Sequence, residues 1–129
     1  MKKSPKQKSP RRKMALASEE MKEWSALLGQ EMQKWPKVTA KPMFGMLGYY
    51  RGPKIFGALP VTRGIGSANG LMFKINPMPP QLQERAGSDS RISATKNLQT
   101  RKWNIFEINC AEDLRDALWW LNQAYEKAK

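Results

Sequence analysis

Basic side chains are concentrated at the start of this 129-residue chain. Residues 1–13 contain seven lysines and arginines and no acidic residue. Each such side chain can neutralise a phosphate of DNA or RNA, so the run predicts nucleic-acid contacts that depend on charge rather than on base sequence. The side chains predicted to contact phosphates are Lys2, Lys3, Lys6, Lys8, Arg11, Arg12 and Lys13.

Residues 1–14 are predicted to form a disordered basic arm. Between Met1 and Met14 no apolar side chain is present to offset the entropy lost on ordering. The stretch 9–12, Ser-Pro-Arg-Arg, resembles the Ser-Pro-basic-basic repeats of histone tails and favours nucleic-acid binding. Two other interpretations stay open: a solubilising tail without a defined partner, or a chain whose translation starts at Met14.

The basic character continues beyond the arm. The whole chain has 23 basic and 11 acidic residues and a formal net charge of +12. Lys41, Arg51 and Lys54 lie beside a predicted hairpin and are expected to extend the basic surface toward nucleic acid. A protein partner or a second copy of the chain is the other association expected. No apolar run approaches the roughly 18 residues of a membrane span, so a cytoplasmic protein without a membrane partner is expected.

The residue types present exclude many kinds of active site. The chain has no histidine and one cysteine, Cys110, which excludes histidine-based triads, histidine metal centres and a disulfide framework. Cys110 is expected to be buried or half-buried. Glu112, Asp113 and Asp116 are expected to complement a helix dipole rather than to bind a metal. We therefore predict no catalytic residues, no cofactor and no metal.

Two glycine-containing segments superficially resemble phosphate-binding loops. Gly64, Gly66 and Gly70 do not have dinucleotide-loop spacing, and an apolar segment rather than a helix follows them. Gly45 and Gly48 are not followed by the Lys-Ser/Thr of a P-loop. Neither segment is predicted to bind a nucleotide, and residues 63–70 are expected to be a flexible loop.

The apolar spacing predicts an α+β fold with an antiparallel sheet of about four to five strands. Residues 15–129 are expected to form a single domain, with residues 87–101 as a loop. An N-terminal helix is capped by Ser18, a short middle helix is opened by Pro80, and a C-terminal helix is capped by Asn109 or Cys110. The predicted helices are 18–35, 80–86 and 109–127, and the predicted strands are 43–51, 55–59, 71–75 and 102–108.

Three short motifs make the body resemble the TfoX N-terminal domain family, which is related to the small α+β proteins of the YjbR type. They are the Met43-Phe44-Gly45 entry after a tryptophan-containing helix, the hairpin over residues 47–58, and the strand over residues 71–75. A late tryptophan-containing strand and a closing helix also fit. The resemblance covers residues 18–127. It implies a non-enzymatic binding or regulatory module, because the family includes regulators of competence for DNA uptake.

The alternative function is binding of a small apolar ligand. Methionines and aromatic residues occur together in and near the predicted strands, and Met43, Phe44, Tyr49 and Phe73 are predicted to line a closed pocket. A second open question concerns Trp119 and Trp120, which point about 100° apart on a helix. Either one of them is exposed to a partner, or the helix has a wide buried face.

Deleting residues 1–13 tests the arm. If all seven basic residues contact duplex DNA, the full chain should bind with a log–log salt slope near −6, at about 0.9 per contact. A titration at several salt concentrations measures the slope for residues 1–129 and for residues 14–129. Equal slopes for the two chains would contradict a role for the arm.

Overall fold

A computed structural model describes residues 14–65, 67–94 and 103–129 of the chain. Within these ranges the fold is α+β, as predicted, with three helices and eight strands. The elements in chain order are β1 (Met14–Leu16), α1 (Glu19–Met32), β2 (Val38–Met43), β3 (Met46–Arg51), β4 (Lys54–Pro60), β5 (Arg63–Ile65), β6 (Gly70–Lys74), α2 (Pro80–Gly87), β7 (Ile92–Ala94), β8 (Trp103–Glu107) and α3 (Asp113–Lys127).

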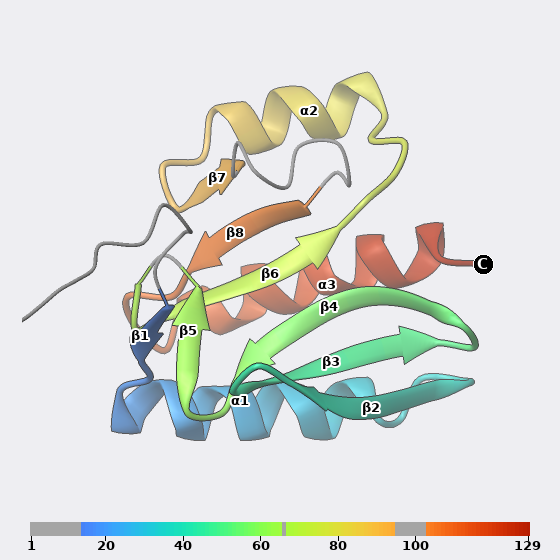
Figure 1. The fold of residues 1–129 in the computed structure, drawn as a ribbon. Helices are drawn as coiled ribbons and strands as arrows, with labels where there is room; N and C mark the ends of the chain where they lie inside the picture. Colours follow the sequence, from blue (N-terminus) through green and yellow to red (C-terminus); the bar gives the residue numbers. More distant parts are fainter. Residues whose placement is uncertain (1–13, 66, 95–102) are drawn as a thin grey trace, which may run out of the picture.

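The strands form two sheets (Figure 1). The larger sheet has six strands in the order β2-β3-β4-β6-β8-β7, and the smaller one pairs β1 with β5. Every pair is antiparallel, as the short connections predicted. The register between β3 and β4 shifts at Tyr49/Tyr50, where a bulge lies.

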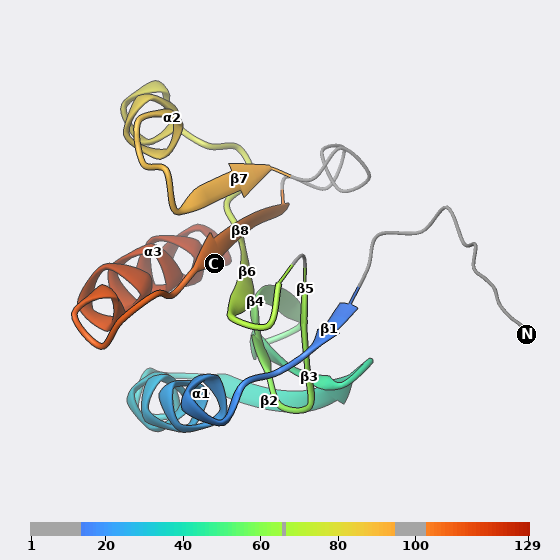
Figure 2. The same cartoon turned by 90° about the vertical axis from the view of Figure 1, so that its left-hand side faces the viewer.

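All three helices lie on one side of the six-stranded sheet, and β1 and β5 lie on the other (Figure 2). The main core fills the space between the helices and the sheet. It includes Met21 and Met32 of α1, Trp120 of α3, and Phe73 and Phe106 of the sheet, each at most 1% exposed. Burial of this apolar surface is the main free-energy source for the fold.

A smaller apolar cluster covers the opposite face of the sheet. Its buried members include Met46, Met72 and Trp103, together with Ile65 from β5. Strand β8 alternates between the two faces of the sheet, since Trp103 belongs to this cluster whereas Phe106 belongs to the main core.

The start of α1 confirms the predicted cap. The hydroxyl of Ser18 accepts a hydrogen bond from the Met21 N–H at 3.0 Å and donates one to Asn69 Oδ1 at 2.8 Å. The helix ends at Met32, three residues earlier than predicted. Trp35 lies beyond the end of the helix, and its ring centroid is 5.0 Å from that of Tyr125.

Helix α3 packs closely on the centre of the sheet. A Cβ added to Gly57 of β4 would lie 2.7 Å from Leu121 Cδ2, so the absence of a side chain at Gly57 permits the close approach. Near the end of the helix, the Tyr125 hydroxyl donates a hydrogen bond to the Pro36 carbonyl at 2.8 Å. This contact joins α3 to the segment that follows α1.

The prediction of four to five strands was too low. Met14 belongs to β1 rather than to the arm, the expected loop at 63–70 contains β5, and the expected loop at 87–101 contains β7. Each of these strands has three residues, too few to show an alternating pattern in the sequence. The predicted strand 43–51 is also interrupted by the turn between β2 and β3.

We expect Gly70→Ala to lower the free energy of unfolding by about 1–3 kcal/mol, as overpacking does. A Cβ at Gly70 would collide with the backbone carbonyl oxygen of Ile65, which cannot move independently of the chain. Gly87→Ala is the matched control, because nothing lies within 4 Å of a Cβ there. Urea unfolding measures both variants, and equal stabilities would contradict the predicted steric conflict.

Candidate functional site

A hollow of about 400 Å³ lies at one end of the six-stranded sheet. The turn between β3 and β4, the end of β6 and the last turn of α3 meet there, toward the right of Figure 1. Three of its lining side chains are lysines, and none is acidic. We call it the three-lysine hollow. Its lining residues are Pro53, Lys54, Ile55, Lys74, Asn76, Ala124, Lys127 and Ala128.

The lysines of the hollow retain donors for a ligand. Lys54 Nζ donates one hydrogen bond to the main-chain oxygen of Lys129 at 3.0 Å, and an ammonium has three donors. Lys74 Nζ lies 5.9 Å from the ring centroid of Trp103, within the range of a cation–π contact. Lys127 is exposed at the end of α3. The arrangement suits an anion such as a phosphate group.

Arg51 neutralises part of the helix end beside this hollow. Its Nη1 donates to the Tyr125 carbonyl at 3.1 Å, and the guanidinium carbon lies 4.2 Å from the Tyr125 ring centroid. The C-terminus of a helix carries about half a negative charge, which disfavours an anion. Arg51 and Lys54 bind main-chain oxygens at this end, and Lys74 and Lys127 add two further positive charges to the lining of the hollow.

The structure brings only part of the predicted basic surface together. Lys54 lies in the three-lysine hollow, and Arg51 is held against Tyr125. Lys41 of β2 lies apart from them, 5.2 Å from the ring centroid of Tyr50. The predicted arm residues Lys2, Lys3, Lys6, Lys8, Arg11, Arg12 and Lys13 are outside the described residues.

Sequence reasoning did not select Lys74 or Lys127 for this site. Each follows an apolar pattern, at the last position of β6 and of α3 respectively. A cation at the end of a strand or helix is a common feature and gives no signal of its own. The strand order brings the end of β6 next to the turn that carries Lys54, and the packing of α3 on β4 and β6 brings the end of the helix to the same place.

The four residues of the predicted apolar pocket do not line one cavity. Tyr49 and Phe73 are buried in the main core, whereas Met43 packs against the cluster on the other face of the sheet. Phe44 is 84% exposed in the turn between β2 and β3. Its φ of 51° is left-handed, and the two-residue hairpin turn requires this conformation at Phe44 as well as at Gly45.

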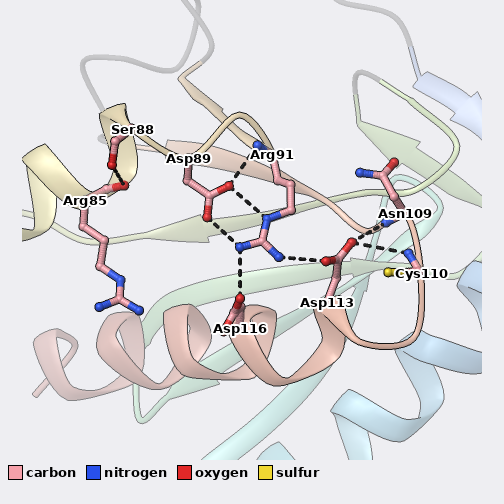
Figure 3. Close-up of polar contacts among 8 residues, drawn as sticks. All are labelled: Arg85, Ser88, Asp89, Arg91, Asn109, Cys110, Asp113 and Asp116. Atoms are coloured by element: carbon pink, nitrogen blue, oxygen red, sulfur yellow. Dashed lines mark hydrogen bonds and ion pairs between the residues drawn. The ribbon is translucent and has the colours of Figure 1, made fainter.

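A network centred on Arg91 fixes the other end of α3 (Figure 3). Its guanidinium donates to Asp89 at 2.9 and 2.7 Å, to Asp113 at 2.7 Å and to Asp116 at 3.0 Å. The hydrogen bond from Arg91 lowers the pKa of Asp89. Burial raises the pKa of Asp113, but hydrogen bonds from the Asn109 N–H and from Arg91 outweigh burial and lower the pKa overall.

The start of α3 differs from the prediction. Asp113 Oδ2 accepts hydrogen bonds from the N–H groups of Asn109 and Cys110 at 2.8 and 3.3 Å, and the helix begins at Asp113 rather than at those residues. Asp113 and Asp116 therefore bind Arg91 in addition to complementing the helix dipole, while Glu112 occupies the cap position without a side-chain bond. Cys110 is exposed, so its predicted burial was wrong.

The tryptophan pair faces inward on a wide surface of α3. Trp120 is 1% exposed and stacks 5.3 Å from Phe73. Trp119 is partly buried, 5.0 Å from the ring of Trp120, and the guanidinium carbon of Arg85 lies 4.1 Å from its ring centroid. The structure therefore favours the wide buried face over an exposed tryptophan.

The described residues contain neither a membrane-spanning helix nor a cluster of metal ligands. No helix there is long and apolar enough to cross a membrane. No group of three potential ligands among histidine, cysteine, aspartate and glutamate could hold a metal in that part of the chain.

Comparison with known proteins finds no matching family model, no matching curated protein and no matching solved structure.

Arg91→Gln is expected to lower the free energy of unfolding by about 1–3 kcal/mol at neutral pH, because three carboxylates lose a charged donor. The pKa values of Asp89 and Asp113 are below their ordinary 3.8 in the folded state. Their contribution is therefore present above that value and is lost as the pH falls through the lowered pKa values. The difference in the free energy of unfolding between wild type and Arg91→Gln should therefore become smaller below about pH 4.

Urea unfolding from neutral pH to about pH 3 measures this difference. Arg115→Gln is the matched control, because Arg115 is an exposed arginine of α3, the helix that Arg91 binds. A gap between wild type and Arg91→Gln that is the same at all pH values would contradict the assigned network.

Proposed function

We propose that this protein is a non-enzymatic module that binds the phosphate backbone of nucleic acid. The observation that carries the proposal is the three-lysine hollow, whose lining includes Lys54, Lys74 and Lys127 but no carboxylate. The net charge of +12 supports it, because such a charge attracts polyanions over a distance. The basic arm supplies additional phosphate contacts from outside the described residues.

The mechanism is charge neutralisation without base reading. A lysine ammonium is a compact point charge that contacts a phosphate from many directions, and its binding releases counterions from the nucleic acid. Such contacts position a protein on the backbone but do not recognise a sequence. They also occur with either DNA or RNA, because they do not involve the 2′-hydroxyl or the base edges.

The wider role within this proposal is a cytoplasmic regulatory module with a protein partner. The resemblance to the TfoX N-terminal domain family supports that role. Its Met43-Phe44-Gly45 motif falls at the turn between β2 and β3, and its hairpin motif corresponds to β3 and β4. The six-stranded sheet with helices on one side is a scaffold that holds the three-lysine hollow at a fixed position.

Replacing Lys54, Lys74 and Lys127 together with glutamine tests the hollow. If each contacts one phosphate, the log–log salt slope for duplex DNA should fall in magnitude by about 2.7. The matched control is Lys22, Lys34 and Arg115 replaced with glutamine, which removes the same charge from exposed positions on α1, on the turn that follows α1 and on α3. Fluorescence anisotropy at several salt concentrations measures both slopes.

The two triple variants separate local binding from net charge. A larger loss of slope in the hollow variant supports the proposal. Equal losses of slope in both variants would mean that binding depends on overall charge and not on the hollow, which would contradict the proposal. An unchanged slope in the hollow variant would also contradict it. Circular dichroism confirms that each variant keeps its helices and strands.

A further inference from the structure

Three of the four large apolar side chains that are exposed in the described residues gather at one end of the sheet. They are Phe44 in the turn between β2 and β3, Val61 after β4 and Leu16 at the end of β1, which are 84%, 46% and 68% exposed. Arg63 lies among them, because it pairs with Leu16 and its N–H donates to the Gly45 carbonyl next to Phe44. We call Leu16, Phe44, Val61 and Arg63 the hairpin-tip patch. It lies at the opposite end of β3 and β4 from the three-lysine hollow, toward the left of Figure 1.

The turn that carries Phe44 is anchored on its neighbours. The Gly45 carbonyl accepts hydrogen bonds from the N–H groups of Val61, Thr62 and Arg63 at 3.0, 2.9 and 3.0 Å. The side chain of Arg63 lies against the same turn, since a Cβ added to Gly45 would be 2.6 Å from Arg63 Cγ. The backbone of the turn is therefore fixed, and little order has to be gained when a ligand contacts the Phe44 ring.

The fold itself does not require a phenyl ring at position 44. The φ of 51° is unfavourable for a side chain with a Cβ, and glycine or asparagine is the usual residue at such a turn position. The ring of Phe44 is exposed, so its burial does not offset this cost. An unfavourable backbone conformation that holds an exposed aromatic ring on a fixed turn points to a binding role.

Positive charge surrounds the hairpin-tip patch and indicates the kind of partner. Arg63 is exposed within it, and the exposed Lys41 lies three residues before the turn residue. The seven basic residues of the arm directly precede β1. Glu19 and Glu20 begin α1 nearby, but Glu19 is paired with Lys22 at 3.1 Å, and the cations outnumber both carboxylates. This surplus favours a polyanion with flat apolar faces over a lipid tail or an apolar protein surface.

Lys41 also provides a positive charge between the hairpin-tip patch and the three-lysine hollow. It lies on the face of the sheet away from the helices, because its Nζ is 5.2 Å from the Tyr50 ring centroid. A Cβ at Gly48 would contact Tyr50 and Met43 at 3.5 and 3.2 Å, and Met43 packs against the apolar cluster of that face. A six-residue strand such as β3 spans about 20 Å, which a few nucleotides of an extended single strand can bridge.

We propose that the hairpin-tip patch binds an unpaired base of single-stranded nucleic acid, which stacks on the Phe44 ring. Arg63 and Lys41 contact the neighbouring phosphates. This inference rests on the proposed binding of nucleic acid and adds a contact that a duplex cannot make, because paired bases cover each other's faces. Every base has a flat face, so stacking selects unpaired strands without reading their sequence.

Three fluorescein-labelled probes test the stack on the full chain by fluorescence anisotropy. They are a single strand of about 12 thymidines, the same strand with abasic sites in place of its bases, and the matching duplex. Phe44→Ala should weaken binding of the intact single strand at least about fivefold, the lower end for one stacked base. It should leave binding of the abasic strand and of the duplex unchanged, since neither offers an unpaired base.

Three further variants separate stacking from general apolar contact. Phe44→Tyr retains an aromatic ring and should bind the single strand like wild type. Phe44→Leu remains apolar but lacks a flat ring, so it should lose as much affinity as Phe44→Ala. The matched control is Leu27→Ala, which removes a 52% exposed apolar side chain from α1 and should change nothing. Circular dichroism checks that every variant keeps its fold.

The contrasts between the probes decide the role of Phe44. A loss confined to the intact single strand and restored by Phe44→Tyr supports the stack. Equal losses on the intact and abasic strands, or wild-type binding by Phe44→Leu, would overturn it. Unchanged oligonucleotide binding by Phe44→Ala, together with weaker binding to phosphatidylserine vesicles, would make the patch a membrane contact and would also overturn it.

Failure of this inference is distinguishable from failure of the proposed function. Phe44→Ala removes no charge, so the salt slope should stay the same, whereas the hollow variant lowers it. Oligonucleotide binding that persists without any effect of Phe44→Ala overturns the hairpin-tip site alone. Absence of binding to all three probes overturns the proposed function and this inference together.

Discussion

Burial of one face of α3 against the six-stranded sheet is the interaction on which the main core depends. Because β4 has no side chain at Gly57, Leu121 can approach the sheet backbone and the helix lies over β4 and β6. Arg91 holds the beginning of the helix and Tyr125 holds its end. The helix is thus fixed at three points along its length, and each of its ends is joined to a different part of the chain.

This placement of α3 creates the basic hollow and also limits it. The carbonyl groups at the helix C-terminus carry partial negative charge, and Arg51 and Lys54 bind two of the nearby main-chain oxygens. Part of the positive charge therefore stabilises the fold rather than a ligand. Lys74 comes from the sheet and lies near Trp103, so its charge is not used by the helix end. The proposed phosphate contact depends on this remaining charge.

The two hollows have different chemistry although β4 contributes to both. The three-lysine hollow lies at the Lys54 end of the strand and has charged donors at its surface, where salt screens them. A second hollow of about 270 Å³ lies near Leu59, at the other end of the strand, and is lined mainly by apolar side chains.

Periodic apolar spacing, turn residues and capping residues were sufficient to predict the α+β class, the Ser18 cap and the β3–β4 hairpin, because these are properties of short stretches of chain. The three-residue strands β1, β5 and β7 were missed because their pairing depends on distant segments. The meeting of Lys54, Lys74 and Lys127 likewise depends on strand order. The three ion pairs of Arg91 could not be predicted either, because two of their partners lie on a distant segment of the chain. The exposure of Phe44 follows from the geometry of the turn between β2 and β3, which the apolar pattern does not show.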